Sequence, residues 1–197
     1  MCPARAADVS GAACLEAPTS SIIKAMASHD YHFTTHWRAP GSVADVYELL
    51  SQPSELPRWW PSVYLAVEEL AAGDPDGRGR ELRLLTKGWL PYRLRWCFRV
   101  TEVDPPSGFA LVAWGDFVGE GRWRFQQDGP EVAITYDWRI RAEKPLLRRL
   151  SWLLRPLFAA NHRWAMAQGQ SSLLREIDRR RSLRRREARD AGSSGVS

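Results

Sequence analysis

A change of hydrophobic period near residue 144 constrains the fold of this chain more than any other feature. Between residues 30 and 141, segments of alternating apolar and polar residues are separated by short turns. Such segments are typical of β-strands that bury one face. After Lys144-Pro145, apolar residues recur at helical spacing as far as Ile177. The sequence therefore predicts an antiparallel sheet followed by one long helix that covers its apolar face.

Turn residues divide the first part of the chain into short elements. Ser42 is placed to cap a helix at 43–51, and a second short helix at 52–62 is bounded by prolines. Pro156 lies inside the long helix, which we expect it to kink or split. Strands are predicted at 30–39, 63–70, 80–87, 92–103, 109–117, 120–127 and 131–141.

The turn at Asp128-Gly129 predicts the register of the last hairpin. If these two residues form the turn, Trp123 lies opposite Ile134, and Phe125 lies opposite Val132. Side chains of the same parity then share one face of both strands. That face is expected to look toward the long helix.

A turn at Val118-Gly119 would extend this face to the preceding strand. Trp114 would then lie opposite Trp123, and Asp116 would have an inward phase. The opposite face collects arginines, which we interpret as a solvated ladder of cross-strand pairs. The expected inward set is Trp96, Phe98, Trp114, Trp123, Phe125, Ile134, Tyr136 and Trp138.

Three stretches carry a resemblance to a known family: "AWGDFVGEGRWRF", "ITYDWRIRAEKPLLRRL" and "FAANHRWAMAQGQSSLLREI". They resemble the START-like, or SRPBCC, superfamily, in the branch named for polyketide cyclases, dehydrases and lipid transport. The resemblance covers Tyr31 to about Ile177. It implies an α+β helix-grip fold, in which a curved antiparallel sheet wraps around the C-terminal helix and leaves a hydrophobic cavity. Functions in the superfamily range from lipid carriage to ring cyclisation, so the fold does not choose among them.

The chain is expected to hold one domain, at residues 29–178. Residues 1–28 are rich in Ala and Ser, do not form a signal peptide pattern and are predicted to be disordered. Met26 is an alternative start of translation. Residues 179–197 are predicted to be a flexible Arg-rich tail that is mostly solvated. The net charge is +5, and four of these charges lie between Arg175 and Asp190.

This charge distribution limits the partners that we expect. The rest of the chain is close to neutral, which does not favour binding to nucleic acid. No apolar run is long enough to cross a membrane. The tail is compatible with weak contact with an anionic membrane surface. The expected partner is a hydrophobic small molecule.

The three cysteines, Cys2, Cys14 and Cys97, do not have the spacing of a zinc site. Their odd number argues against a disulfide framework, and we expect a reducing, cytoplasmic location. No nucleotide-binding loop or metal-ligand pattern is present in the sequence, so we expect neither a metal nor a cofactor.

Asn161 and His162 are polar residues on the apolar stripe of the long helix. They are either structural groups bonded to the sheet or groups that orient the polar end of a ligand. His162 is also the candidate acid or base, with Asp116 as a catalytic partner or, alternatively, a turn residue. Gly169, on the same stripe, is expected to let the sheet come close to the helix. The candidate ligand-binding residues are Asn161, His162, Met166, Trp96, Phe98, Trp114, Trp123, Tyr136 and Trp138.

Two function classes follow. The first is binding of a lipid or polyketide-like molecule in the cavity. The alternative is a polyketide cyclase or dehydratase that uses His162 as acid or base. A third interpretation, an interaction module, applies if the tryptophans fill the cavity themselves.

Overall fold

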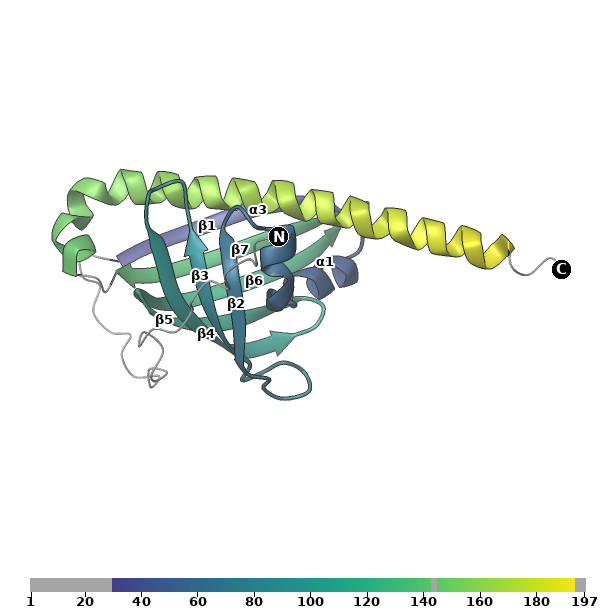
Figure 1. Cartoon of the computed structure of the whole chain (residues 1–197), viewed down its shortest axis with the longest axis horizontal. Coiled ribbons are helices and arrows are strands. Elements are labelled where there is room, and N and C mark those ends of the chain that lie inside the picture. The colour runs from purple at the N-terminus through teal and green to yellow at the C-terminus, as the bar shows by residue number, and fades with distance from the viewer. Residues whose placement is uncertain (1–29, 143–144, 194–197) are drawn as a thin grey trace, which may run out of the picture.

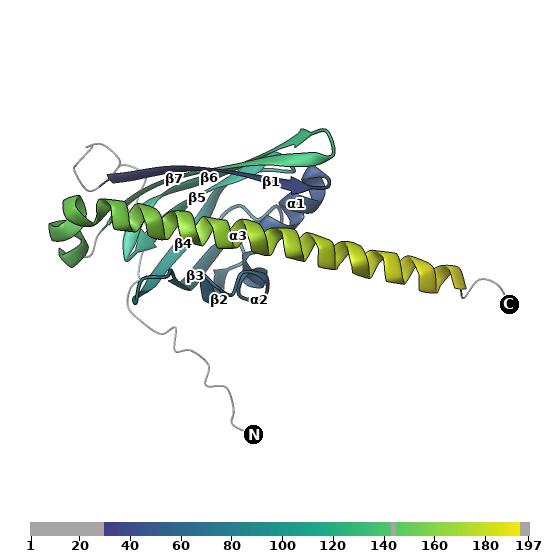
Figure 2. The ribbon, with the colours of Figure 1, turned by 90° about the horizontal axis from the view of Figure 1, so that it is seen from above.

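The computed structural model of the chain describes residues 30–142 and 145–193. Its strands form one seven-stranded antiparallel sheet in the order β1-β7-β6-β5-β4-β3-β2. The sheet curves beneath the long helix α3, as Figures 1 and 2 show from two directions. The elements are β1 (Asp30–Pro40), α1 (Val43–Leu50), η2 (Pro53–Glu55), α2 (Leu56–Trp59), β2 (Tyr64–Ala71), β3 (Glu81–Lys87), β4 (Arg93–Asp104), β5 (Gly108–Gly115), β6 (Phe117–Asp128), β7 (Glu131–Ala142) and α3 (Pro145–Ser193).

This arrangement confirms the predicted helix-grip fold. The side chain of Ser42 accepts a hydrogen bond from the backbone N–H of Asp45, as expected for an N-cap. The predicted second helix is a 3-10 turn, η2, that continues into the single α-helical turn α2. Helix α3 is not split at Pro156. Figure 1 shows its first turns bent away from the axis of the remainder.

The register of the last hairpin differs from the predicted one by two residues. Trp123 pairs with Tyr136, and Asp128 pairs with Glu131, so the turn is Gly129-Pro130. Pro130 has no backbone N–H and cannot close the ladder opposite Gln127, as the predicted turn required. A shift of two residues preserves the face of each side chain.

The preceding hairpin turns earlier in the chain than predicted, and this changes the face of one tryptophan. Phe109, not Trp114, lies opposite Trp123, because the chain turns at Gly115 and Asp116. Gly115 has a φ of 123°, which favours glycine. The inward prediction for Trp114 is therefore wrong, since Trp114 pairs with Cys97 on the outer face of the sheet. The other residues of the expected inward set belong to the buried core.

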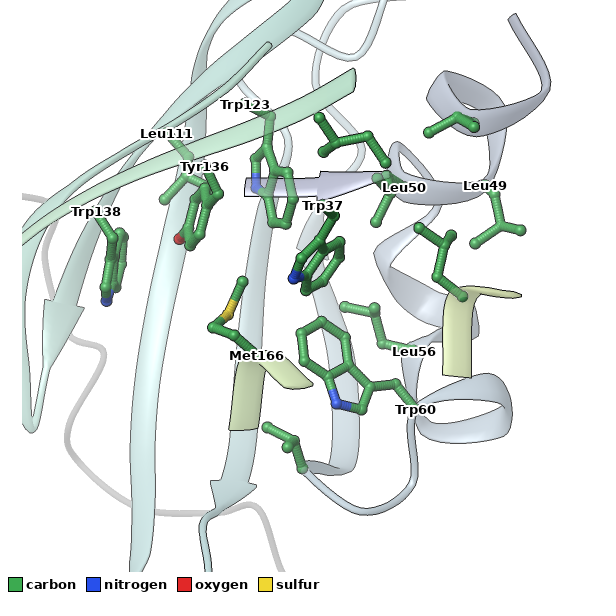
Figure 3. Close-up of a cluster of buried hydrophobic side chains, with 14 of the residues drawn as sticks. Trp37, Leu49, Leu50, Leu56, Trp60, Leu111, Trp123, Tyr136, Trp138 and Met166 are labelled. Atoms are coloured by element: carbon green, nitrogen blue, oxygen red, sulfur yellow. The ribbon is translucent and has the colours of Figure 1, made fainter. Parts of the chain in front are cut away.

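The core is densest at the end of the sheet covered by α1, η2 and α2. Trp37 contacts Trp60 and Trp123, with ring centroids 5.7 and 5.5 Å apart. Figure 3 shows these indoles beside Leu49, Leu50 and Leu56. We call this region the filled end. In Figure 2, α1 and α2 lie on opposite sides of α3 at this end of the sheet.

Ion pairs join the second half of α3 to the filled end. The carboxylate of Glu176 is buried and accepts hydrogen bonds from Arg58, Arg179 and Arg180. Arg184 also pairs with Asp45 of α1. These arginines hold the pKa of Glu176 well below its usual range.

The predicted boundary at residue 178 is not the end of an element. Helix α3 continues to Ser193, and it projects beyond the sheet in Figure 1. The predicted flexible tail at 179–197 is therefore helical as far as Ser193. The predicted disordered segment 1–28 and the alternative start at Met26 lie outside the described residues.

Two further expectations concern disulfide bonds and membrane-spanning segments. Cys97 is disulfide-bonded, which corrects the expectation against disulfides and removes the cysteine argument for a reducing compartment. Among the described helices, none is both long and apolar enough to cross a membrane.

Candidate functional site

A cavity lies between the sheet and the first half of α3. Its volume is about 180 Å³, and its wall is mainly aromatic and aliphatic. An apolar cavity of about 150 Å³ is sufficient to hold benzene, so this one has room for at least one aromatic ring. We call this region the cavity end. Its lining residues are Tyr31, Phe33, Trp60, Val63, Tyr64, Thr86, Lys87, Gly88, Tyr92, Leu94, Trp96, Asp116, Phe117, Tyr136, Trp138, Ile140, Phe158, Asn161, His162, Ala165 and Met166.

His162 contributes an imidazole to the cavity wall. Its ring stacks on Phe33 of β1, with ring centroids 4.2 Å apart. Burial, assisted by the charge of Arg163, lowers the pKa of His162 to about 4. The Nε2 atom is buried and has no hydrogen-bond partner among the described residues. His162 is therefore a neutral polar group at neutral pH.

Asn161 ties α3 to the loop between β3 and β4. Its Oδ1 accepts hydrogen bonds from the backbone N–H groups of Trp89 and Leu90, at 3.0 and 3.4 Å. Gly88 is required here, because a Cβ at this position would overlap the Asn161 amide. This geometry matches the structural interpretation of Asn161, although the residue also lines the cavity.

Asp116 lies at the turn between β5 and β6. Its carboxylate accepts a hydrogen bond of 2.9 Å from the backbone N–H of Arg95, and its own N–H donates to the Arg95 carbonyl. Asp116 also lines the cavity. A carboxylate beside His162 would raise the pKa of the imidazole, whereas this pKa is lowered. The two predicted catalytic residues therefore line one cavity, and burial outweighs any effect of a carboxylate on the pKa of His162.

The predicted ligand-binding residues divide into two groups. Trp96, Tyr136, Trp138 and Met166 line the cavity together with Asn161 and His162. Phe98 and Trp123 are buried in the core and do not line it. Trp114 lies on the outer face of the sheet, as described above.

Polar groups in the wall hold the aromatic rings and remain neutral. The indole N–H of Trp96 donates to the hydroxyl of Thr86 at 3.0 Å, which orients this ring. Burial raises the pKa of Tyr64 and that of Tyr136, so both hydroxyls stay protonated. The described wall also contains the side chains of Lys87 and Asp116.

The contributions of Phe33 in β1 and of Phe117 at the start of β6 to the cavity were not predicted. Phe33 pairs with Trp138 across the β1–β7 ladder, and Phe117 lies 5.1 Å from Trp96 between ring centroids. The alternation of β1 already placed Tyr31 and Phe33 on the face of Trp37. The missing information was the pairing of β1 with β7, which closes the sheet over a long sequence separation.

Gly169 has a different role from the expected one. A Cβ at this residue would overlap the indole of Trp60, which comes from the end of α2 and not from the sheet. Gly169 therefore admits an indole next to the helix, and Trp60 separates the filled end from the cavity end. Among the described residues, no cluster of His, Cys, Asp and Glu could hold a metal ion.

Comparison with solved structures supports the fold. The crystal structure of TTHA0849 from Thermus thermophilus matches with a TM-score of 0.60 and 17% identity, covering 74% of this chain and 99% of the other. The Zhui aromatase/cyclase from Streptomyces sp. R1128 matches with a TM-score of 0.60 and 19% identity, covering 77% and 96%. Norcoclaurine synthase from Thalictrum flavum matches with a TM-score of 0.51 and 15% identity, covering 75% and 86%.

Sequence comparison identifies the family. No curated protein shows significant similarity to the chain. The family model described as "Polyketide cyclase / dehydrase and lipid transport" matches residues 31–177. These residues include nearly the whole sheet, the cavity lining and helix α3 as far as Ile177. The chain therefore belongs to the polyketide cyclase/dehydrase and lipid transport family, within the SRPBCC superfamily.

Proposed function

We propose that this protein binds a neutral hydrophobic small molecule, lipid-like or polyketide-like, in the cavity between the sheet and α3. The observation that carries the proposal is the aromatic wall around unfilled space, with His162, Tyr64 and Tyr136 as neutral polar groups. Ligand sites commonly combine an apolar wall with a few polar groups that orient the ligand. His162, Tyr64 and Tyr136 can offer hydrogen bonds but no counter-charge, so this part of the wall favours an uncharged ligand.

The proposed ligand contacts follow from the position of each side chain. Trp96 and Trp138 offer aromatic faces, and Met166 offers a flexible apolar contact from α3. His162 offers a hydrogen-bonding nitrogen beside Phe33. The family and the similarity of the fold to that of an aromatase/cyclase are consistent with a ring-containing ligand.

The enzymatic alternative is a cyclase or dehydratase that uses His162 as acid or base. A pKa of about 4 leaves little imidazolium at neutral pH and makes the imidazole a weak base. This property favours binding over proton transfer in the free protein. In a binding protein, His162→Ala leaves ligand affinity nearly intact, whereas in an enzyme it abolishes turnover.

A fluorescence titration with the neutral probe N-phenyl-1-naphthylamine tests the proposal. We expect saturable binding to the wild type and its loss in Ala165→Phe, which places a ring in the cavity from the helix side. The control is Ala188→Phe, which makes the same change on the exposed end of α3 and should bind like the wild type. Equal binding to all three proteins would contradict the proposal.

A further inference from the structure

An exposed tryptophan lies beside the mouth of the cavity. Trp89, in the loop between β3 and β4, has 48% of its surface exposed. Its neighbours Lys87 and Gly88 line the cavity, and Lys87 is itself exposed, so the cavity reaches the surface at this loop. The hydrogen bonds from Trp89 and Leu90 to Asn161 hold the loop against α3.

The strand ends that flank this loop are basic: Lys87 ends β3, and Arg93 and Arg95 lie at the start of β4. Lys87, Arg93 and Arg95 are exposed, and residues 87–95 contain no acidic side chain. Within the described part of the chain, none of these three cations forms an ion pair. Arginines on the outer face of the sheet differ in this respect, since Arg99 pairs with Glu81 and Arg122 with Glu102. The nearby Asp116 carboxylate is bonded to backbone at Arg95.

We propose that residues 87–95, which we call the mouth loop, dock on an anionic lipid bilayer. An indole is well suited to the interface between headgroups and acyl chains, and unpaired cations are attracted to anionic headgroups. Docking in this orientation presents the cavity mouth to a membrane, where hydrophobic molecules are concentrated. The purpose of docking rests on the proposed function, but the docking itself is tested independently of it.

The Arg-rich end of α3 is a weaker candidate for the same contact. Arg179, Arg180 and Arg184 are already paired with acidic side chains. The exposed large apolar residue there is Leu183, which is not aromatic. Among the described residues, this end therefore has part of its charge already neutralised and presents no exposed aromatic side chain.

Vesicle co-sedimentation tests the proposal. The full chain is mixed with vesicles of phosphatidylcholine, either alone or with phosphatidylserine. We expect binding to the anionic vesicles, and a loss of at least about tenfold in both Trp89→Ala and Arg93→Glu. The matched controls Leu183→Ala and Arg185→Glu remove an exposed apolar side chain and reverse a charge on α3, and they should bind like the wild type.

Three results would overturn the proposal. The first is an absence of binding to anionic vesicles by the wild type. The second is a loss in the α3 controls with none in the mouth-loop variants, which would assign membrane contact to the Arg-rich end. The third is a dimer in light scattering that dissociates in Trp89→Ala, which would assign the mouth loop to self-association.

The probe titration separates this proposal from the proposed function. Trp89 and Arg93 do not line the cavity, so Trp89→Ala and Arg93→Glu should bind N-phenyl-1-naphthylamine in solution as the wild type does. Vesicle binding without probe binding in the wild type would contradict the proposed function and leave membrane docking standing.

Discussion

The filled end and the cavity end lie beneath the same helix and are lined by the same kinds of side chain, yet one is packed and the other is open. At the filled end, Trp37, Trp60 and Trp123 contact one another and the leucines of α1 and α2. At the cavity end, Trp96 and Trp138 line unfilled space.

The difference shows that aromatic content does not determine whether a core is filled. The short helices supply the side chains that fill one end, and no described element performs this role at the other. The change from packed core to cavity occurs within one turn of α3. The Trp60 indole lies against Gly169, whereas Ala165 lines the cavity. The predictions below use this contrast.

The largest effect is expected for Trp37→Ala at the filled end. Removing a fully packed indole should lower the free energy of unfolding by about 3–5 kcal/mol, as measured by urea denaturation. Trp89→Ala removes an exposed indole and should change it by less than about 0.5 kcal/mol. Similar losses in the two variants would mean that the filled end is not packed as described.

Glu176→Gln tests the ion pairs that attach α3 to the filled end. The neutral side chain leaves Arg58 and its neighbours without a buried carboxylate, so stability should fall by about 3 kcal/mol. Glu187→Gln, exposed on the same helix, is the control. An unchanged urea midpoint in Glu176→Gln would show that the pairs do not stabilise the fold.

The same group predicts an acid dependence. Because the folded pKa of Glu176 is depressed below its ordinary value of 4.5, its contribution is present above that pH and is lost as the pH falls further. Glu176→Gln should therefore show a smaller loss of stability below about pH 4.5 than the wild type does. Parallel curves for the two proteins would contradict this assignment.

Gly169→Ala and Ala165→Leu form a matched pair one helical turn apart. The added methyl at residue 169 overlaps Trp60 and should cost about 2 kcal/mol. The larger side chain at residue 165 enters the cavity and should change stability by less than about 1 kcal/mol while weakening probe binding. The reverse order of stabilities would contradict the placement of the cavity.

The last prediction concerns the pH dependence of stability at His162. Its folded pKa of about 4 lies below the ordinary 6.5, so it contributes stability above pH 6.5 that is lost as the pH falls toward 4. His162→Phe keeps a ring against Phe33 and should remove about 2 kcal/mol of the stability difference between about pH 7.5 and pH 5. Urea curves at both pH values test this, and an unchanged difference would mean that the imidazole is hydrated.

Local sequence signals predicted the elements well. The cap at Ser42, the alternation in β1 and β4 and the helical stripe through Met166 each depend on neighbouring residues. The hairpin turns were less predictable: the turn at Gly115 and Asp116 shifts the partner of Trp123 from Trp114 to Phe109, and this odd shift of five residues reverses the face of Trp114. In the last hairpin, Pro130 was the residue that could have indicated the observed register, because it has no backbone N–H to pair with Gln127.

The site required information that no local pattern contains. Pairing of β1 with β7 brings Phe33 to His162, although they are far apart in sequence. Whether Trp96 and Trp138 fill the space or surround it depends on the curvature of the sheet and on where α2 ends. The burial of Glu176 was also missed, because two of its partners, Arg179 and Arg180, belong to the segment that was predicted to be a solvated tail.

Native mass spectrometry of the wild type and Ala165→Phe, purified side by side, tests the central claim most directly. Our account predicts that the wild type carries, or takes up from a mixture of neutral hydrophobic compounds, one small molecule that can be extracted after denaturation, and that Ala165→Phe does not. A wild type that remains empty under these conditions, or an adduct that persists in Ala165→Phe, would contradict a ligand site at the cavity end.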